Sequence, residues 1–363
     1  MTIRGRFAPT PSGRLHLGNA RTALLAWAQI RRLGGIFVLR IEDVDPVRCR
    51  RALELDQIAD LRWLGIDWDE GPDVGGAWGP YRQSERGDIY AGAVASLSTF
   101  PCSCTRRELQ ELGRGPYPGT CVGGPTHPER PLALRWIPRY GTTRFEDGCA
   151  GPVEADVLDT LGPCVVRRTD AVWSYQLAVA VDDLRMGMTH ILRGADLLES
   201  TARQLAIMDA LAASDGGAKA AERPRYAHVP VVYGRDGLKL SKRHGAPDLT
   251  ALREAGADPT RAASRNEPAR EASVSMSATL SGVEGAVSMQ FDRYDGHTRL
   301  HTLDLPVSWF DGASPAGSDA TVLVEVDGLP PQSLATTVYG QAAWFSSRLA
   351  GAGVASYVTS DAA

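Results

Sequence analysis

The sequence predicts an α/β protein built on a doubly wound parallel sheet, and three observations lead to this fold class. Short, continuous apolar segments alternate with amphipathic segments of helical period over residues 1–75. The same alternation resumes in the second half of the chain, from about residue 166. Glycines and polar loops separate the segments, as expected where parallel strands are connected through helices.

The first half of this sheet is predicted element by element. Residues 3–10 form a short strand that runs into a loop, and residues 19–34 form a helix that stops at a glycine pair. Residues 36–43, "IFVLRIED", are a continuous apolar run suited to a strand buried on both faces, and residues 52–66 form a second helix. The β-α-β-α order favours a Rossmann-type sheet, whose ligands bind beyond the carboxyl ends of the strands. The loops "RFAPTPSG" and "RIEDVD" should lie there.

Composition divides the rest of the chain. The segment after residue 75 is richer in Gly, Pro and Cys and is typical of an inserted module, whereas "SYQLAVAVDD", "THILRGADLL" and "STARQLAIMDALA" resume the α/β pattern. Beyond about residue 260 the chain turns to Ala, Ser, Gly and Pro, which indicates a linker, a disordered stretch or a small appended β unit. The predicted parts are residues 1–75 (first half of the α/β domain), 76–165 (inserted module), 166–258 (second half of the α/β domain) and 259–363 (acidic tail).

Bulk properties set limits on the class of protein. The chain has 363 residues, 43% of them hydrophobic, so it can bury a full hydrophobic core. Six cysteines are too few for a disulfide scaffold in a chain of this length. No apolar run is long enough for a membrane span, and we expect a cytoplasmic protein. The net charge of −4 hides an asymmetry: residues 256–363 carry 6 Arg, no Lys and 12 acidic residues, and the remainder carries 33 basic against 31 acidic residues. A nearly neutral body can still present a basic face to nucleic acid.

The loop after the first strand, "RFAPTPSGRLHLGN", has the character of a ligand-binding loop. Two prolines stiffen it, and Ser12, Gly13 and Gly18 leave room for a ligand near the backbone. His16 and Asn19 fall just before or within the first turn of the predicted helix, where exposed amides attract phosphate. Taken alone, this stretch could equally be an ordinary strand-loop-helix connection.

A second stretch, "GLKLSKRHG" at residues 237–245, carries two of the three lysines of the chain. Lys239 and Lys242 lie in a predicted loop that could close over a polyphosphate and neutralise its charge. By itself such a run is more often a solvated turn.

Together the two stretches resemble the paired signatures of class I aminoacyl-tRNA synthetases, here "HLGN" at residues 16–19 and "KLSKR" at residues 239–243. Five segments are similar in sequence, order and spacing to the glutamate-specific branch of this class: "RFAPTPSGRLHLGNARTALLAW", "LRIEDVDP", "SYQLAVAVDD", "HILRGADLL" and "KLSKRHGA". The large C-terminal helical domain of glutamyl-tRNA synthetases has no counterpart, so the chain resembles the truncated glutamyl-Q tRNA(Asp) synthetases. The resemblance covers residues 3 to about 258, about 70% of the chain.

This resemblance implies a ligase that activates L-glutamate with ATP and esterifies it onto the queuosine base at the wobble position of tRNA(Asp). No membrane and no protein partner are implied. The residues that the family implies for glutamate are Arg6, Phe7, Ala8, Pro9, Thr10, Glu42, Tyr175 and Arg193. Those implied for ATP are His16, Gly18, Asn19 and Lys242, and the catalytic groups are His16, Lys239 and Lys242. ATP would arrive with Mg²⁺, for which the sequence offers no dedicated cage, although Asp43 and Asp45 could assist. In physical terms Arg6 and Arg193 can supply cations for the substrate carboxylates, and Glu42 can hold its ammonium.

Three cysteines in the inserted module have the spacing of a zinc site. Cys102, Cys104 and Cys121 can supply three thiolates, and a closed structural site needs a fourth ligand. The spacing alone suggests His127, whereas the family pattern implies the phenol oxygen of Tyr117. We expect one structural Zn²⁺ held by Cys102, Cys104, Tyr117 and Cys121, with His127 as the substitute. Such a site would stabilise the fold of the inserted module. We expect this module to contact RNA, and Arg106, Arg107 and Arg114 are the candidate RNA-contacting residues.

Two rival interpretations remain open. The chain could be a shortened glutamyl-tRNA synthetase that charges the 3′ end of tRNA(Glu), or a synthetase-like binding protein that has lost catalysis. Activation of glutamate without any tRNA would favour the truncated family over the first rival. The presence of both "HLGN" and "KLSKR" argues against the second.

Overall fold

The computed structural model describes residues 2–113, 115–138, 142–157, 162–214, 223–232 and 248–256, together with the backbone of six strands between residues 273 and 360. The predicted catalytic lysines, Lys239 and Lys242, and the candidate Arg114 lie outside the described residues. Among the helices described, none has the length and apolar character needed to cross a membrane.

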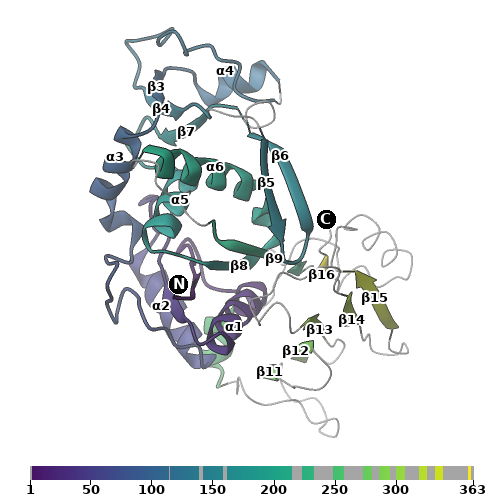
Figure 1. The fold of residues 1–363 in the computed structure, drawn as a ribbon. Helices are drawn as coiled ribbons and strands as arrows, with labels where there is room; N and C mark the ends of the chain where they lie inside the picture. The colour runs from purple at the N-terminus through teal and green to yellow at the C-terminus, as the bar shows by residue number, and fades with distance from the viewer. Residues whose placement is uncertain are drawn as a thin grey trace, which may run out of the picture.

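A six-stranded sheet forms the centre of the catalytic domain (Figure 1). Its strands follow the order β2-β1-β8-β9-β5-β6, and the first five run parallel to their neighbours while β6 pairs antiparallel with β5. This confirms the predicted α/β class. The strands are β1 (Arg4–Phe7), β2 (Ile36–Leu39), β5 (Thr142–Asp147), β6 (Gly151–Asp156), β8 (His190–Gly194) and β9 (Arg225–Val229).

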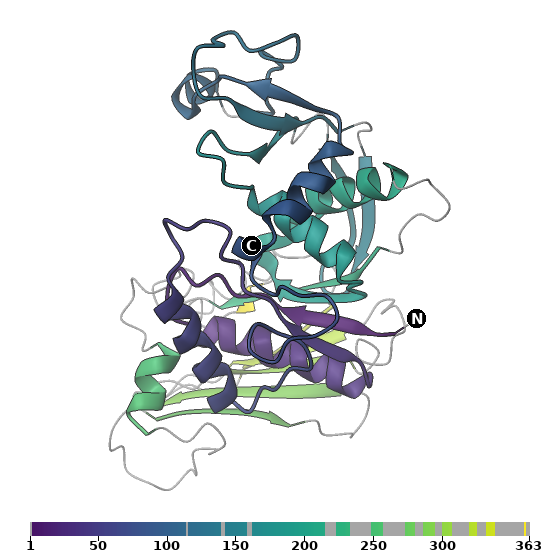
Figure 2. The ribbon, with the colours of Figure 1, turned by 90° about the vertical axis from the view of Figure 1, so that its left-hand side faces the viewer.

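Helices cover both faces of this sheet. In Figures 1 and 2, α1 (Leu17–Arg32) lies on one side, and α5 (Tyr175–Arg185) and α6 (Leu198–Ser214) lie on the other. Leu177, Ala178 and Val181 of α5 are fully buried in the main hydrophobic cluster. The short turns η1 (Gln83–Glu85) and η3 (Ala195–Leu197) connect elements around the same core.

The two N-terminal helices begin and end as local sequence dictates. His16 caps α1, and the helix therefore starts at Leu17, slightly before the predicted residue 19. Gly34 follows its last turn with φ of +62°, a conformation that favours glycine. Helix α2 (Arg51–Trp63) packs against α7 (Leu249–Glu254), where Thr250 and Arg253 both donate to the buried carboxylate of Asp60.

Strands β1 and β2 are shorter than the predicted ranges 3–10 and 36–43. After Phe7 the chain reaches two prolines, which lack the N–H that a ladder needs. After Leu39 the regular ladder ends, although the amides of Arg40 and Glu42 still donate to the carbonyls of Phe7 and Pro9 at 3.1 and 3.0 Å. Ile41 forms an isolated bridge with Arg82.

The segment between α2 and α5 contains a second, smaller sheet. After α3 (Gly87–Ala95), strands β3 (Thr99–Cys102), β4 (Ala133–Trp136) and β7 (Cys164–Arg167) form an antiparallel sheet, with α4 (Arg106–Glu111) beside it. This part lies at the top of Figure 1. Strands β5 and β6, although within the same stretch of sequence, belong to the large sheet.

The C-terminal part contains strands where the sequence indicated either a linker or a β unit. Strands β11 (Ser273–Thr279), β12 (Ala286–Tyr294), β13 (Leu300–Pro306), β14 (Asp319–Val324) and β15 (Gln332–Thr337) form an antiparallel sheet. Two further short strands, β10 (Val231–Val232) and β16 (Thr359–Ser360), pair antiparallel.

Candidate active site

A cavity of about 420 Å³ opens at the carboxyl ends of β1, β8 and β9. This is the edge at which open parallel sheets bind ligands. Every predicted glutamate-binding residue lines it, as do the predicted ATP-binding residues that the structure describes. These residues are Arg6, Phe7, Ala8, Pro9, Thr10, His16, Gly18, Asn19, Glu42, Tyr175 and Arg193.

Arg6 and Arg193 differ in their partners. Arg6 Nε and Nη2 lie 3.1 and 2.9 Å from the two oxygens of Asp183, a buried two-pronged ion pair. Arg193 donates instead to neutral groups, with Nε 3.0 Å from His228 Nε2 and Nη2 2.7 Å from Thr201 Oγ1. Its third nitrogen, Nη1, is buried without a hydrogen-bond partner among the described residues. Arg193 is therefore the better suited of the two to receive a carboxylate from a ligand.

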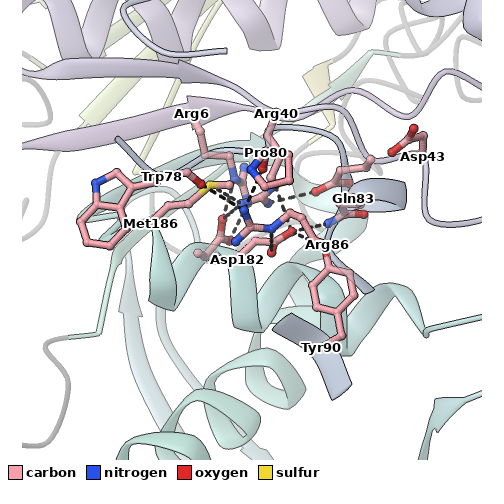
Figure 3. Close-up of polar contacts among 12 residues, drawn as sticks. Arg6, Arg40, Asp43, Trp78, Pro80, Gln83, Arg86, Tyr90, Asp182 and Met186 are labelled. Atoms are coloured by element: carbon pink, nitrogen blue, oxygen red, sulfur yellow. Dashed lines mark hydrogen bonds and ion pairs between the residues drawn. The ribbon is translucent and has the colours of Figure 1, made fainter. Parts of the chain in front are cut away.

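Beneath the cavity lies a buried network of charged residues (Figure 3). Arg40 Nη1 lies 2.6 Å from Asp183 and Nη2 lies 3.1 Å from Glu42. Asp182 accepts hydrogen bonds from Gln83, Tyr90 and Arg86 at 2.9, 2.9 and 2.7 Å. The opposite charges balance, so the network can be buried without an isolated ion.

Glu42 and Tyr175 lie at the cavity wall. Burial raises the pKa of Glu42, and the nearby Arg40 and Arg6 oppose this shift. An ammonium group bound beside Glu42 would favour its charged form further. Burial also raises the pKa of Tyr175, with Glu42 acting in the same direction, so its phenol stays protonated and can donate a hydrogen bond.

His16 is held by the helix that it caps. Its Nδ1 accepts a hydrogen bond from the amide of Asn19 at 3.3 Å, while the side chain of Asn19 accepts from the amide of His16 at 3.1 Å. This capping box places the proton of the neutral imidazole on Nε2. The arrangement also occupies the Asn19 amide, one of the donors that the sequence suggested for phosphate.

The two other acidic candidates have structural partners. Asp43 accepts from both the amide and the hydroxyl of Ser84, at 2.9 and 2.6 Å. Asp45 pairs with Arg168 at 2.7 Å.

Three cysteines beside the smaller sheet converge as a metal site requires, one at the end of β3 and two in the loops before and after α4. Cys102, Cys104 and Cys121 place their sulfur atoms within 4.8 Å of one another. Cys104 Sγ lies 3.6 Å from Cys121 Sγ, and the Tyr117 oxygen lies 3.4 and 3.5 Å from the sulfurs of Cys102 and Cys104. Tetrahedral zinc with Zn–S bonds of about 2.3 Å needs ligand separations of about 3.8 Å. The residues therefore fit a zinc ion.

Of the two alternatives for the fourth ligand, only Tyr117 lies beside the sulfurs. His127 Nδ1 lies 3.3 Å from Glu129, and its half-exposed side chain is outside the cysteine group of the described chain. Burial alone would raise the pKa of Cys121, but hydrogen bonds from the amide of Thr126 and the hydroxyl of Tyr117 lower it to about 5. A thiolate at neutral pH is the form that binds zinc.

Comparison with known proteins identifies the class to which this fold and cavity belong. Residues 2–115 and 125–266 match the family described as "tRNA synthetases class I (E and Q), catalytic domain". The chain belongs to this family, and it is a ligase of the aminoacyl-tRNA synthetase type. Class I synthetases use ATP and Mg²⁺.

Within this family, the resemblance to glutamyl-Q tRNA(Asp) synthetases is confirmed. The chain is 48% identical over 275 residues to the Glutamyl-Q tRNA(Asp) synthetase of Symbiobacterium thermophilum, an alignment that covers 70% of this chain and 82% of the relative. It is 44% identical to the Glutamate–tRNA ligase of an Anaeromyxobacter species, over 70% of this chain and 55% of the ligase. The glutamate-tRNA synthetase structure from Elizabethkingia anophelis superposes with a TM-score of 0.58 at 29% identity, over 68% of this chain and 55% of that one.

Several residues around the cavity were missed by the sequence reasoning. Asp182, Asp183 and Arg40 carry the buried network, and Asp147 and His228 support Arg193. A signal for the first three was present, because "AVAVDD" and "IFVLRIED" place charges inside apolar runs, where only a paired charge is tolerated. Asp147 and His228 carry no comparable pattern.

Proposed function

We propose that this protein activates L-glutamate with ATP and transfers it to the queuosine base at the wobble position (34) of tRNA(Asp). One observation carries the glutamate part: Arg193 lines the cavity with a buried nitrogen that has no partner among the described residues. A substrate side-chain carboxylate would satisfy that nitrogen and its charge. The name of the Symbiobacterium relative supports the choice of tRNA(Asp) and queuosine.

In this proposal the cavity holds glutamate by its charged groups. Arg193 receives the side-chain carboxylate, and Glu42 receives the ammonium beside the phenol of Tyr175. Arg6 is held in place by its ion pair with Asp183, so it contributes positive charge and forms part of the cavity wall without moving toward the substrate. The loop of residues 7–10 forms the adjoining wall. Rigid placement of these groups lowers the entropy cost of aligning the reacting carboxylate.

The chemistry proceeds in two steps without a covalent enzyme intermediate. The α-carboxylate of glutamate attacks the α-phosphorus of ATP, pyrophosphate leaves, and glutamyl-adenylate forms. A hydroxyl of the queuosine cyclopentene ring then attacks the activated carbonyl, and AMP leaves. We assign His16, the backbone near Gly18 and Asn19, and the loop lysines Lys239 and Lys242 to neutralising the charge of the phosphates, with Mg²⁺ accompanying ATP.

The other parts of the chain have supporting roles in the same proposal. A zinc ion would stabilise the inserted module and take no part in the chemistry. Its ligands would be Cys102, Cys104, Tyr117 and Cys121. We infer a division into residues 1–75, 76–165, 166–258 and 259–363, in which the second stretch supplies β5 and β6 to the large sheet as well as two strands to the smaller one. The cytoplasm, where tRNA is found, is the inferred location.

A second candidate function is glutamylation of the 3′ end of tRNA(Glu). The 44% identity to a Glutamate–tRNA ligase favours it, and the same cavity would serve both reactions. The two candidates differ only in the RNA and its accepting hydroxyl.

Labelled glutamate, offered with tRNA(Asp) bearing queuosine, tRNA(Asp) bearing guanosine, and tRNA(Glu), separates these functions. The proposal expects label on the queuosine form alone, and pyrophosphate exchange with glutamate in the absence of RNA. Label on tRNA(Glu) would establish the second candidate instead. Absence of AMP formation with every RNA would indicate a binding protein. A Lys242→Ala variant is the matched inactive control.

A further inference from the structure

A buried carboxylate–imidazole pair lies behind Arg193. Asp147, at the end of β5, accepts three amide hydrogen bonds at Oδ1, from Cys149, Ala150 and His228 at 2.9, 2.9 and 3.1 Å. Its other oxygen, Oδ2, lies 2.5 Å from His228 Nδ1. Both side chains are fully buried. Asp147 is thus held by four contacts that leave it no freedom to turn.

The other ring nitrogen of His228, Nε2, contacts Arg193. His228 Nε2 lies 3.0 Å from Arg193 Nε and 2.9 Å from Thr201 Oγ1. A guanidinium only donates hydrogen bonds, so Nε2 must be the unprotonated acceptor. The single ring proton therefore sits on Nδ1 and points at Asp147. Burial lowers the pKa of His228, which keeps the ring neutral.

This contact and two others fix the orientation of Arg193. Its Nη2 lies 2.7 Å from Thr201 Oγ1, and its guanidinium carbon lies 5.2 Å from the centre of the Tyr226 ring. Nη1 is buried without a hydrogen-bond partner among the described residues, and Arg193 is one of the residues that line the cavity. Among the described residues, no carboxylate forms an ion pair with Arg193, in contrast to Arg6 and Arg40. The negative charge nearest to it along these bonds is Asp147, one imidazole away.

We infer that Asp147 is a positioning residue that fixes the tautomer of His228 and thereby aims Arg193 at the acidic side chain of the substrate amino acid. The inference rests on the proposed use of Arg193 for glutamate. The imidazole gives Arg193 an acceptor without a full charge, so the guanidinium is oriented while its attraction for a substrate carboxylate is kept. A direct carboxylate partner would compete with the substrate.

Asp147→Asn is the sharpest test because it is nearly isosteric. The three amides at Oδ1 require an oxygen there, so the new NH₂ group faces His228 Nδ1. The ring must then carry its proton on Nε2, where it confronts the N–H of Arg193. The same kind of tautomer inversion underlies the loss of activity when a buried aspartate behind a catalytic histidine is replaced by asparagine.

In glutamate-dependent pyrophosphate exchange, Asp147→Asn should raise the KM for glutamate by roughly 10- to 100-fold and leave the KM for ATP within about 2-fold. Preference for glutamate over glutamine should fall by a similar factor. In a His228→Leu background the same change should have little further effect, because the link to Arg193 is already gone. A KM for glutamate that Asp147→Asn leaves unchanged, or equal effects on both substrates, would overturn the inference.

The tautomer can also be measured without any variant. In ¹⁵N-histidine-labelled protein, long-range ¹H–¹⁵N spectra distinguish the two neutral forms, and His228 should carry its proton on Nδ1 (assigned by its loss in His228→Leu). Observation of the Nε2–H form in the wild type would refute the mechanism. If the wild type instead shows the expected tautomer but no glutamate-dependent exchange, the proposed function fails while the tautomer assignment stands.

Discussion

Arg6 and Asp183 form a buried two-pronged ion pair directly under the cavity, with N–O distances of 3.1 and 2.9 Å. Asp183 also accepts from Arg40 at 2.6 Å, so a single carboxylate holds two arginines. This places Asp183 at the joint between strand β1, the chain after β2, and helix α5. The carboxylate has a structural role that its neighbours cannot take over.

Replacement of Asp183 by Asn should therefore destabilise the fold by about 3–5 kcal/mol, because buried Arg6 loses its ion-pair partner and buried Arg40 keeps only Glu42 and the more distant Asp182. Asp209→Asn is the matched control: Asp209 makes the same two-pronged contact with Arg223, but at the surface. That change should cost less than about 1 kcal/mol. The free energy of unfolding in urea measures both, and similar costs for the two variants would contradict the argument.

The free energy of unfolding should decrease in two separate pH ranges as the solution is made more acidic. Burial lowers the pKa of His190 to about 4, below the 6.5 of an unfolded chain. The unfolded state therefore binds more protons between these values, and stability is lost as pH falls from 6.5 to 4.

Burial would raise the pKa of Asp183, but Arg40 and Arg6 lower it to about 2 from 3.8. Its contribution, on the order of 2 kcal/mol, is present above pH 4 and lost as pH falls toward 2.

His190→Gln isolates the first window. The variant should show a shallower fall in unfolding free energy between pH 6.5 and 4, and the remaining slope includes His228, whose pKa burial also lowers. Denaturant titrations at several pH values provide the measurement. An unchanged slope would show that His190 is not responsible.

Much of the catalytic domain could be predicted from periodicity, because continuous apolar runs such as residues 36–39 are specific for strands buried on both faces. The cavity residues were predictable because the segments that carry Arg6, Glu42 and Arg193 resemble the glutamate-specific synthetases, and parallel topology brings the ends of these strands to one edge. The pairing of β5 with β9 was not predictable, since it joins segments distant in sequence. For the same reason the partners of Arg6 and Arg193 became evident only in three dimensions.

Gly18 makes room for the ring of His16. A Cβ at Gly18 would lie 3.0 Å from His16 Cε1 and 3.1 Å from Nδ1, so Gly18→Ala should displace the imidazole by a few tenths of an ångström. We expect the KM for ATP to rise by roughly 10-fold, since misplacement of a positioning group is costly. Gly92→Ala in α3 is the control, because a Cβ there meets nothing within 4 Å. It should keep full activity and gain slight stability.

The fourth ligand of the zinc site can be settled by paired variants. The Tyr117 oxygen lies 3.4 Å from Cys102 Sγ, whereas His127 Nδ1 contacts Glu129. Purified protein should contain about one zinc per chain, and Cys104→Ser should abolish it. Tyr117→Phe should weaken zinc binding by roughly 10- to 100-fold, since three thiolates remain, and His127→Ala should leave it unchanged.

Competition with a chromophoric chelator measures these affinities directly and does not depend on the enzymatic reaction. Removal of the metal should lower the melting temperature of the module while glutamate activation without RNA survives, because the cavity lies in the other sheet. The reverse result, with His127→Ala releasing zinc and Tyr117→Phe retaining it, would transfer the fourth position to the histidine. It would also require the loop of residues 121–130 to rearrange, since the half-exposed side chain of His127 lies outside the cysteine group, with Nδ1 3.3 Å from Glu129.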